Sequence, residues 1–119
     1  MSLIKIYHNP KCSNSRQALA LVREHGHEPE VVLYLDTPPT RQELQDIIQA
    51  TGVSARALMR SKEAIYGELG LDNPDLTEDV LIDAMLAHPV LMNRPIVITP
   101  KGTRLCRPPE LVLEILPTT

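Results

Sequence analysis

Aromatic residues are scarce in this chain of 119 residues: tryptophan and phenylalanine are absent, and there are three tyrosines. The hydrophobic core must therefore consist of aliphatic side chains. Proteins that bind single-stranded nucleic acid stack bases on aromatic side chains, and this chain offers few of them. Its net charge of −3 also argues against a protein-wide basic surface for phosphates. We therefore expect no nucleic-acid partner.

Long apolar runs and closely spaced cysteines are also missing. No run approaches the roughly 20 apolar residues that span a bilayer, so no membrane partner is expected. The N-terminus lacks the plan of a signal peptide, because polar residues follow a very short apolar stretch. Cys12 and Cys106 lie far apart, and no Cys/His cluster has the spacing of zinc ligands. We expect a cytoplasmic protein with free thiols and no metal site.

The first third of the chain predicts a strand–helix–strand unit. Residues 3–7 and 30–35 are apolar runs typical of strands, and the nearly continuous second run suggests burial on both faces. Residues 13–25 between them carry apolar side chains at helical spacing, and Gly26 follows as a stop. Two strands joined by such a helix are expected to be parallel.

The middle of the chain predicts helices and no strand. Helices are expected at residues 40–52, 54–60 and 77–88. Thr40 and Glu43 stand three residues apart and form a capping box for the first of them. Thr77 caps the last helix, which has His88 on its buried face and ends before Pro89.

The last quarter of the chain predicts a hairpin and a final helix. Residues 95–99 and 103–107 are strands whose short connection makes them antiparallel, and the helix covers residues 109–116. The whole order of elements is that of a thioredoxin-like fold. We therefore predict an α/β protein with a four-stranded mixed sheet flanked by helices. Residues 1–119 are expected to form one domain, with a helical subdomain at about 40–88 inserted between strands two and three.

The chemistry of the chain is expected at Cys12, in the turn between the first strand and the first helix. Helix N-termini favour a thiolate there, Lys11 is adjacent, and Arg16 is expected one turn away on the same face. These surroundings predict a reactive thiol with a lowered pKa, against the alternative of an inert buried cysteine. Ser15 takes the second position of a C-x-x-C pair. Its hydroxyl can bond the sulfur but cannot form a disulfide, so an outside thiol must reset the site.

Several other polar residues have two interpretations. Cys106 stands in a strand, and core packing is the preferred role. His8 either polarises the thiol or only ends the first strand. Arginines stand at the ends of elements: Arg60, Arg94 and Arg107. A lone arginine is usually a solvated charge, but three guanidiniums beside a thiolate would bind a tetrahedral oxyanion. The predicted hairpin brings the last two of them to one edge of the sheet.

Four segments of the chain together carry a resemblance to a known protein family. They read Tyr7-His8-Asn9-Pro10-x-Cys12-x-x-Ser15-Arg16, Ala57-Leu58-Met59-Arg60, Asn93-Arg94-Pro95-Ile96-Val97 and Gly102-Thr103-Arg104-Leu105-Cys106-Arg107-Pro108. Together they resemble the glutaredoxin-coupled arsenate reductases. The resemblance implies that Cys12 attacks arsenate and that the three arginines hold the covalent cysteinyl-arsenate, with His8, Ser15 and Arg16 supporting the thiol.

The resemblance also implies the source of electrons. Glutathione adds as a co-substrate, with no bound cofactor, and arsenic is reduced to the trivalent state. Glutaredoxin, the expected protein partner, then resolves the mixed disulfide and arsenite is released. The phosphatase-like arsenate reductases are excluded, because their C-x5-R loop requires an arginine where this chain has Ala18.

Two other functions stay open at the level of sequence. A glutathione-dependent thiol reductase of another substrate would use the same nucleophile. A redox-sensing interaction protein, like the RNA-polymerase-binding relatives, would carry a C-x-x-C switch, and Ser15 in place of the second cysteine argues against it.

Overall fold

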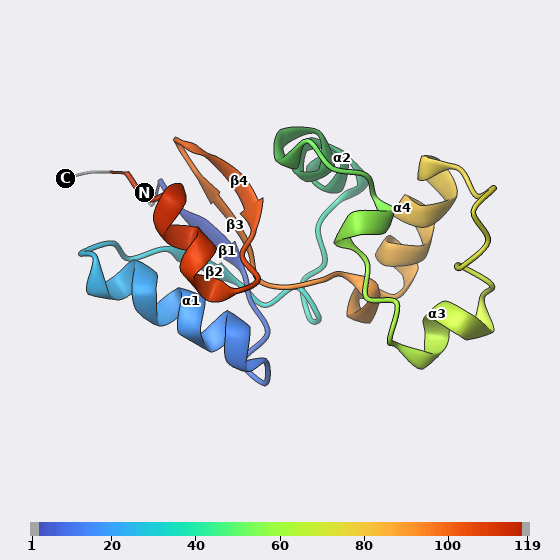
Figure 1. Cartoon of the computed structure of the whole chain (residues 1–119), viewed down its shortest axis with the longest axis horizontal. Coiled ribbons are helices and arrows are strands. Elements are labelled where there is room, and N and C mark those ends of the chain that lie inside the picture. Colours follow the sequence, from blue (N-terminus) through green and yellow to red (C-terminus); the bar gives the residue numbers. More distant parts are fainter. Residues whose placement is uncertain (1–2, 118–119) are drawn as a thin grey trace. The chain divides into compact units, whose positions relative to one another are not determined.

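The computed structural model describes residues 3–117 and divides into two compact units (Figure 1). The first unit is built from the chain up to Thr37 and from Arg94 onward. The second unit is the continuous segment Pro38–Asn93. The first unit holds the strands of the sheet, and the second unit holds the helices that lie between Pro38 and Asn93.

The first unit contains a four-stranded sheet with the strand order β2-β1-β3-β4. Its strands are β1 (Lys5–Tyr7), β2 (Glu30–Val32), β3 (Ile96–Thr99) and β4 (Gly102–Leu105). β1 pairs in parallel with β2 and antiparallel with β3, and β3 pairs antiparallel with β4. The predicted mixed sheet, the parallel first pair and the antiparallel hairpin are therefore confirmed.

β2 differs from its prediction in length and in burial. The strand stops at Val32, whereas the apolar run continues to Leu35. Among the described residues 3–117, β2 is an edge strand that pairs with β1 alone. Glu30 is exposed, and the other residues of β2 are half-buried. The prediction of burial on both faces was therefore wrong, because an apolar run does not reveal whether a strand has neighbours on one side or two.

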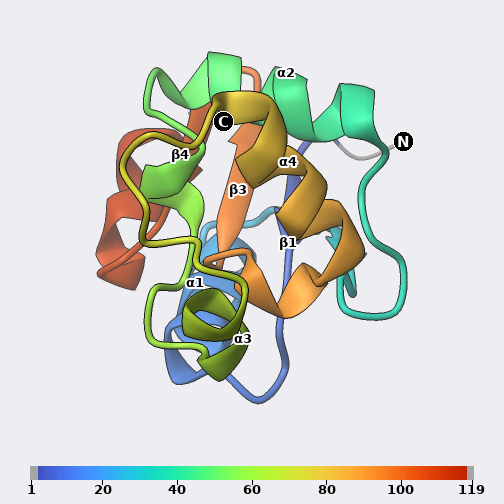
Figure 2. The ribbon, with the colours of Figure 1, turned by 90° about the vertical axis from the view of Figure 1, so that its right-hand side faces the viewer.

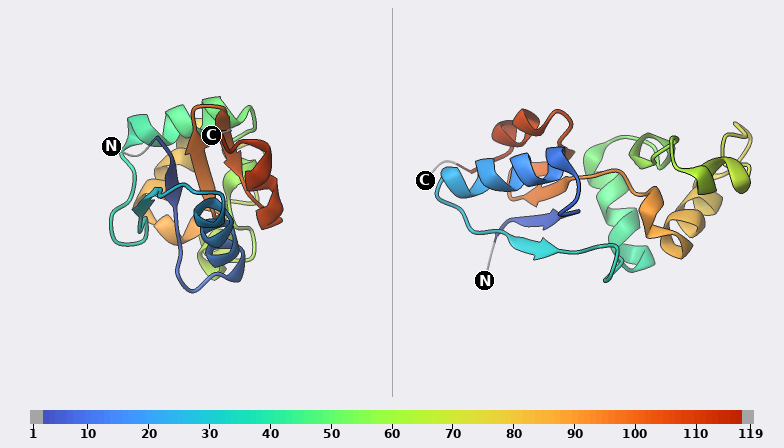
Figure 3. Two further views of the ribbon diagram at one scale, coloured as in Figure 1. Left: turned by 90° about the vertical axis from the view of Figure 1, so that its left-hand side faces the viewer. Right: turned by 90° about the horizontal axis from the view of Figure 1, so that it is seen from below.

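Two helices, α1 (Ser13–Glu24) and η3 (Pro109–Glu114), pack together on one side of the sheet (Figures 1 and 3). The buried cluster around them is aliphatic except for one cysteine; it comprises Ile4, Ile6, Ala18, Val22, Val97, Cys106, Val112, Ile115 and Leu116. The prediction that the core as a whole is aliphatic was too strict, because the three tyrosines are also buried. Gly26 follows α1 with φ 86°, a left-handed conformation that favours glycine. The predicted last helix is present, but it is a shorter 3-10 helix.

The second unit is helical. It contains α2 (Arg41–Thr51), η1 (Arg56–Leu58), α3 (Ala64–Glu68), α4 (Glu78–Ala87) and η2 (Pro89–Leu91). The predicted capping box is present: Thr40 Oγ1 accepts from the Glu43 N–H at 3.1 Å, and Glu43 Oε1 accepts from the Thr40 N–H at 2.8 Å. Thr77 caps α4 by accepting from the Val80 N–H. His88 is the half-buried C-cap of α4 rather than part of its buried face.

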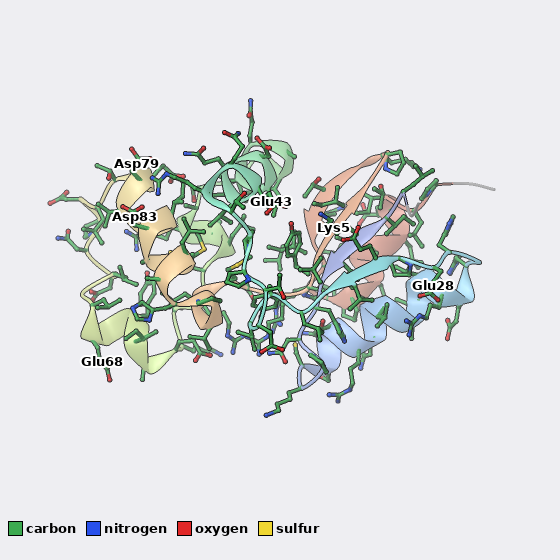
Figure 4. The ribbon with its side chains drawn as sticks, turned by 180° about the vertical axis from the view of Figure 1, so that it is seen from behind. Lys5, Glu28, Glu43, Glu68, Asp79 and Asp83 are labelled. Atoms are coloured by element: carbon green, nitrogen blue, oxygen red, sulfur yellow. The ribbon has the colours of Figure 1, made fainter. Side chains whose placement is uncertain are left out.

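α2 and α4 pack against each other in this unit (Figure 2). Apolar side chains of both helices are buried, and the Arg41 guanidinium at the start of α2 forms ion pairs with Asp79 and Asp83 of α4. The two aspartates stand one turn apart on α4 (Figure 4). A helical segment thus separates β2 from β3, as predicted. That residues 1–119 form one domain stays a prediction.

Candidate active site around Cys12

Cys12 is the N-cap residue of α1. Its backbone is extended (φ −94°, ψ 123°), and its carbonyl accepts the first helical hydrogen bond, from the Arg16 N–H at 3.0 Å. The Cys12 N–H donates to the Asn9 carbonyl at 3.0 Å, which closes the loop between β1 and α1. The sulfur therefore stands beside the free N–H groups of the first helical turn, where negative charge is stabilised.

Opposing effects act on the Cys12 thiol. Burial raises its pKa, since only 8% of the residue is exposed. The backbone N–H of Ser15 and the guanidiniums of Arg94 and Arg107 act in the other direction, and together they hold the pKa below its ordinary value. The predicted lowering is therefore present, but the cations responsible are distant in sequence; neither is the neighbouring Lys11 or Arg16.

The β3–β4 hairpin brings Arg94 and Arg107 together. Ile96 pairs with Leu105, so that residues 94 and 107 stand two positions beyond this pair on opposite strands. The Arg107 Nη1 donates to the Arg94 carbonyl at 3.1 Å and to the Cys12 sulfur at 3.7 Å. Both arginines precede a proline through a cis peptide bond. One guanidinium thus joins the end of the hairpin to the thiol.

Arg60, the third predicted arginine, belongs to the second unit. Its Nε donates to Glu63 Oε2 at 3.0 Å, and its backbone N–H donates to the Leu91 carbonyl at 2.8 Å. Two of the three predicted arginines therefore lie at the Cys12 sulfur within the first unit. A role for Arg60 at the thiol stays a prediction.

Ser15 is fully buried and supports the Cys12 loop from inside α1. Its Oγ lies 2.5 Å from His8 Nδ1 and accepts from the Asn9 N–H at 3.1 Å. Its hydroxyl was expected to bond the sulfur, but it is the Ser15 backbone that interacts with the thiol. Burial lowers the pKa of His8, and the Arg23 and Arg16 charges add to this effect. His8 therefore binds the Ser15 hydroxyl as a neutral ring and fixes the loop.

Arg16 does not occupy the predicted place beside the thiol. Its side chain is exposed, and Nη1 donates to the Pro10 carbonyl at 2.9 Å. Asn9 was not among the predicted site residues. Its carbonyl accepts a hydrogen bond from the Cys12 N–H, and its Oδ1 accepts one from the Lys11 N–H at 3.0 Å. An asparagine between a strand and a proline is typical of such turns, so the signal was present.

Cys106 lies in the core of the first unit with no exposed surface. Its sulfur is 3.6 Å from the Arg104 carbonyl, to which the thiol donates. Burial raises the pKa of Cys106 to about 12, and the Glu114 carboxylate adds to this while Arg104 opposes it. Core packing, the preferred interpretation, is confirmed.

Residues 3–117 contain neither a cluster of metal ligands nor a membrane-spanning helix. No group of three His, Cys, Asp or Glu side chains there could hold a metal ion. In the same part of the chain, no helix is long and apolar enough to cross a membrane. What the structure brings together at Cys12 is a sulfur with a lowered pKa and two guanidiniums, a set that suits attack on a small anion.

The chain matches known proteins over almost its whole length. The model of the ArsC family matches residues 7–115. An arsenate reductase of Escherichia coli K12 is 58% identical over 98% of this chain and 83% of its own length. The E. coli protein YfgD, described as uncharacterized, is 54% identical over 95% of this chain and 96% of its own.

A solved structure agrees with these matches. The arsenate reductase from Vibrio cholerae is 48% identical and superposes with a TM-score of 0.93, over 97% of this chain and 98% of that one. The likeness in sequence and the likeness in backbone each cover nearly the whole chain, and the family model spans both the Cys12 loop and the hairpin that carries Arg94 and Arg107. The chain therefore belongs to the ArsC family, whose solved members have a thioredoxin-like fold.

Proposed function

We propose that this protein reduces arsenate to arsenite, with Cys12 as the nucleophile and glutathione and glutaredoxin as the reductants. The observation that carries the proposal is the Cys12 thiol at the N-terminus of α1, which Arg107 contacts at 3.7 Å and whose pKa Arg94 and Arg107 lower. The proposal that arsenate is the substrate is supported by the matched relatives, since several of them are named arsenate reductases. The cytoplasm, where glutathione keeps thiols reduced, is the proposed place of the reaction.

The first step is attack of the Cys12 thiolate on arsenate. A sulfur–arsenic bond forms and one arsenate oxygen leaves as water after taking up protons. The guanidiniums of Arg94, Arg107 and Arg60 offset the charge of the oxyanion, and planar forks of donors suit its oxygens. The helix N-terminus stabilises the thiolate before attack.

The second step transfers two electrons to arsenic. The glutathione sulfur forms a disulfide bond with the Cys12 sulfur, the sulfur–arsenic bond breaks, and its electron pair stays on arsenic. Arsenic passes from the pentavalent to the trivalent state, and the thiol proton passes to the released arsenite. A glutaredoxin thiolate then attacks the glutathione sulfur and frees Cys12. Ser15 in place of a second cysteine makes the outside thiols necessary.

The test is a coupled assay in which NADPH oxidation depends on arsenate, glutathione, glutaredoxin and glutathione reductase. We expect turnover by the wild-type protein, none by Cys12→Ser, and nearly full turnover by Cys106→Ala, because Cys106 lies in the core away from the reaction. Absence of arsenate-dependent turnover in the complete system would refute the proposal.

A second candidate is glutathione-dependent reduction of another substrate. It is favoured by the 54% identity to YfgD, a relative of matching length with no activity in its name. Activity on glutathione mixed disulfides requires Cys12 but does not require arginines that bind an oxyanion. If Arg60→Ala leaves such activity intact and the protein does not reduce arsenate, this candidate replaces the first.

A further inference from the structure

A pocket lies beside the Cys12 loop in the first unit. Its volume is about 360 Å³, and it is lined by residues 8–11 on one side and by Leu33, Leu35 and Asp36 on the other. Cavities of this size hold small ligands. The first lining segment is the loop after β1, and the second is the chain that leaves β2.

The pocket carries one charge of each sign. Lys11 supplies an ammonium group and Asp36 a carboxylate, and both residues are exposed. Within residues 3–117 neither side chain forms an ion pair or a hydrogen bond. Both charged groups are thus available to a ligand that itself carries a carboxylate and an ammonium group.

The walls between these charges are apolar. Leu33 and Leu35 are 41% and 44% exposed, and both line the pocket. They extend beyond the end of β2, where the chain turns away from the sheet. Methylene groups of a ligand that spans from Lys11 to Asp36 would remove this apolar surface from water.

The loop that lines one side of the pocket leads directly into Cys12. Lys11 immediately precedes Cys12, and the Cys12 N–H donates to the carbonyl of Asn9, which lines the pocket. His8, also a lining residue, is fixed to Ser15 in the first turn of α1. A ligand seated here therefore contacts the loop that leads into Cys12.

We propose that this pocket binds the body of glutathione, a small zwitterionic thiol peptide, while its sulfur reacts at Cys12. Lys11 binds a carboxylate of the peptide, Asp36 binds its ammonium group, and Leu33 and Leu35 contact its methylene groups. The inference rests on the proposed function for the identity of the thiol, and it assigns residues that the reaction scheme above does not use.

Binding without reaction is the first test. The probe is S-methylglutathione, which cannot form a disulfide, titrated into the Cys12→Ser protein and followed by NMR or calorimetry. We expect Lys11→Gln and Asp36→Asn each to weaken binding about tenfold. The exposed residues Lys101 and Asp72 provide matched controls, and Lys101→Gln and Asp72→Asn should bind the probe as the parent does. Equal binding by all five proteins, or no binding, overturns the proposal.

Kinetics separate the pocket from the reaction. At saturating arsenate, Lys11→Gln and Asp36→Asn should raise the KM for glutathione about tenfold and leave the KM for arsenate unchanged. An unchanged KM for glutathione in an active enzyme overturns the pocket and leaves the proposed function standing. Probe binding that depends on Lys11 and Asp36, in a protein that does not reduce arsenate, supports the pocket and refutes the proposed function.

The exposed leucines allow one more outcome. Leu33→Ser and Leu35→Ser should raise the KM for glutathione, because both side chains line its pocket. If they raise the KM for glutaredoxin and leave that for glutathione unchanged, the surface binds the protein partner instead and the proposal is overturned.

Discussion

Cys12 and Cys106 are both largely removed from solvent, yet their thiols are shifted in opposite directions. The pKa of Cys12 is below its ordinary value, and that of Cys106 is raised to about 12. Burial disfavours the thiolate at both places. What differs is the surrounding polar groups: Cys12 has a helix N-terminus and two guanidiniums, whereas Cys106 packs among aliphatic side chains. Reactivity is thus set by the groups that face the sulfur, not by burial alone.

The largest expected effect is a contrast in alkylation rate between the two thiols. At neutral pH, iodoacetamide should modify Cys12 at least about a hundredfold faster than Cys106, because the pKa of Cys12 is lowered while that of Cys106 is raised to about 12 and its sulfur has no exposed surface. Peptide mapping by mass spectrometry over time measures both rates in one sample. In urea the two thiols should react alike, and similar rates in the folded protein would contradict the comparison.

The next effect concerns the guanidinium that contacts the Cys12 sulfur. Arg107→Ala removes a donor at 3.7 Å and a positive charge, so the pKa of Cys12 should rise and alkylation below that pKa should slow several-fold. The measurement is the rate of alkylation as a function of pH. Arg104→Ala is the matched control, since Arg104 pairs with Glu114 and is not among the groups that lower the Cys12 pKa.

A smaller effect, on the free energy of unfolding, is expected from Ser15, the buried residue that hydrogen-bonds the Cys12 loop. Ser15→Ala leaves the Asn9 N–H and His8 Nδ1 without their buried partner, and the free energy of unfolding should fall by about 1–3 kcal/mol. Urea denaturation measures the loss, with the exposed Ser13→Ala as control. The pKa of Cys12 should change less than in Arg107→Ala, since the Ser15 backbone N–H remains. An equal change would assign the hydroxyl a direct role at the sulfur.

The smallest effect is a dependence of stability on pH that comes from His8. Its pKa is lower in the folded protein than in the unfolded chain, because burial and nearby arginines disfavour the charged ring. Below about pH 6.5 the unfolded chain therefore binds more protons, and the free energy of unfolding decreases as the pH falls. His8→Gln should flatten this part of the curve, measured by urea denaturation from neutral to mildly acidic pH. A curve unchanged by the substitution would show that His8 does not cause it.

Sequence patterns predicted the parts of this molecule that depend on neighbouring residues. The capping box at Thr40, the stop at Gly26 and the pairing of the strands all follow from local chemistry or from short connections. The pattern could not reveal that β2 is an edge strand, because a neighbour on the far side is a property of the whole sheet. Likewise, proximity in sequence predicted Arg16 beside the thiol, but its guanidinium donates to the Pro10 carbonyl of the same loop.

At the site, the sequence predicted which residues matter better than it predicted what they touch. Cys12, Arg94 and Arg107 were singled out, and the hairpin register brings these arginines together as expected. Ser15 was also singled out, but its hydroxyl binds His8 and Asn9. The direction in which a side chain of the first helical turn points is decided by packing, and it cannot be predicted from the sequence alone.

The pairing of β1 with both β2 and β3 has a consequence for the order in which the protein is made. β1 ends at Tyr7 and β3 begins at Ile96, so the middle of the sheet cannot form until most of the chain has left the ribosome. The helical segment Pro38–Asn93 emerges before that time and has its own local contacts to form. Biosynthesis thus completes the nucleophile-bearing unit after the helical one, since the arginine-bearing hairpin follows the helical segment in the chain.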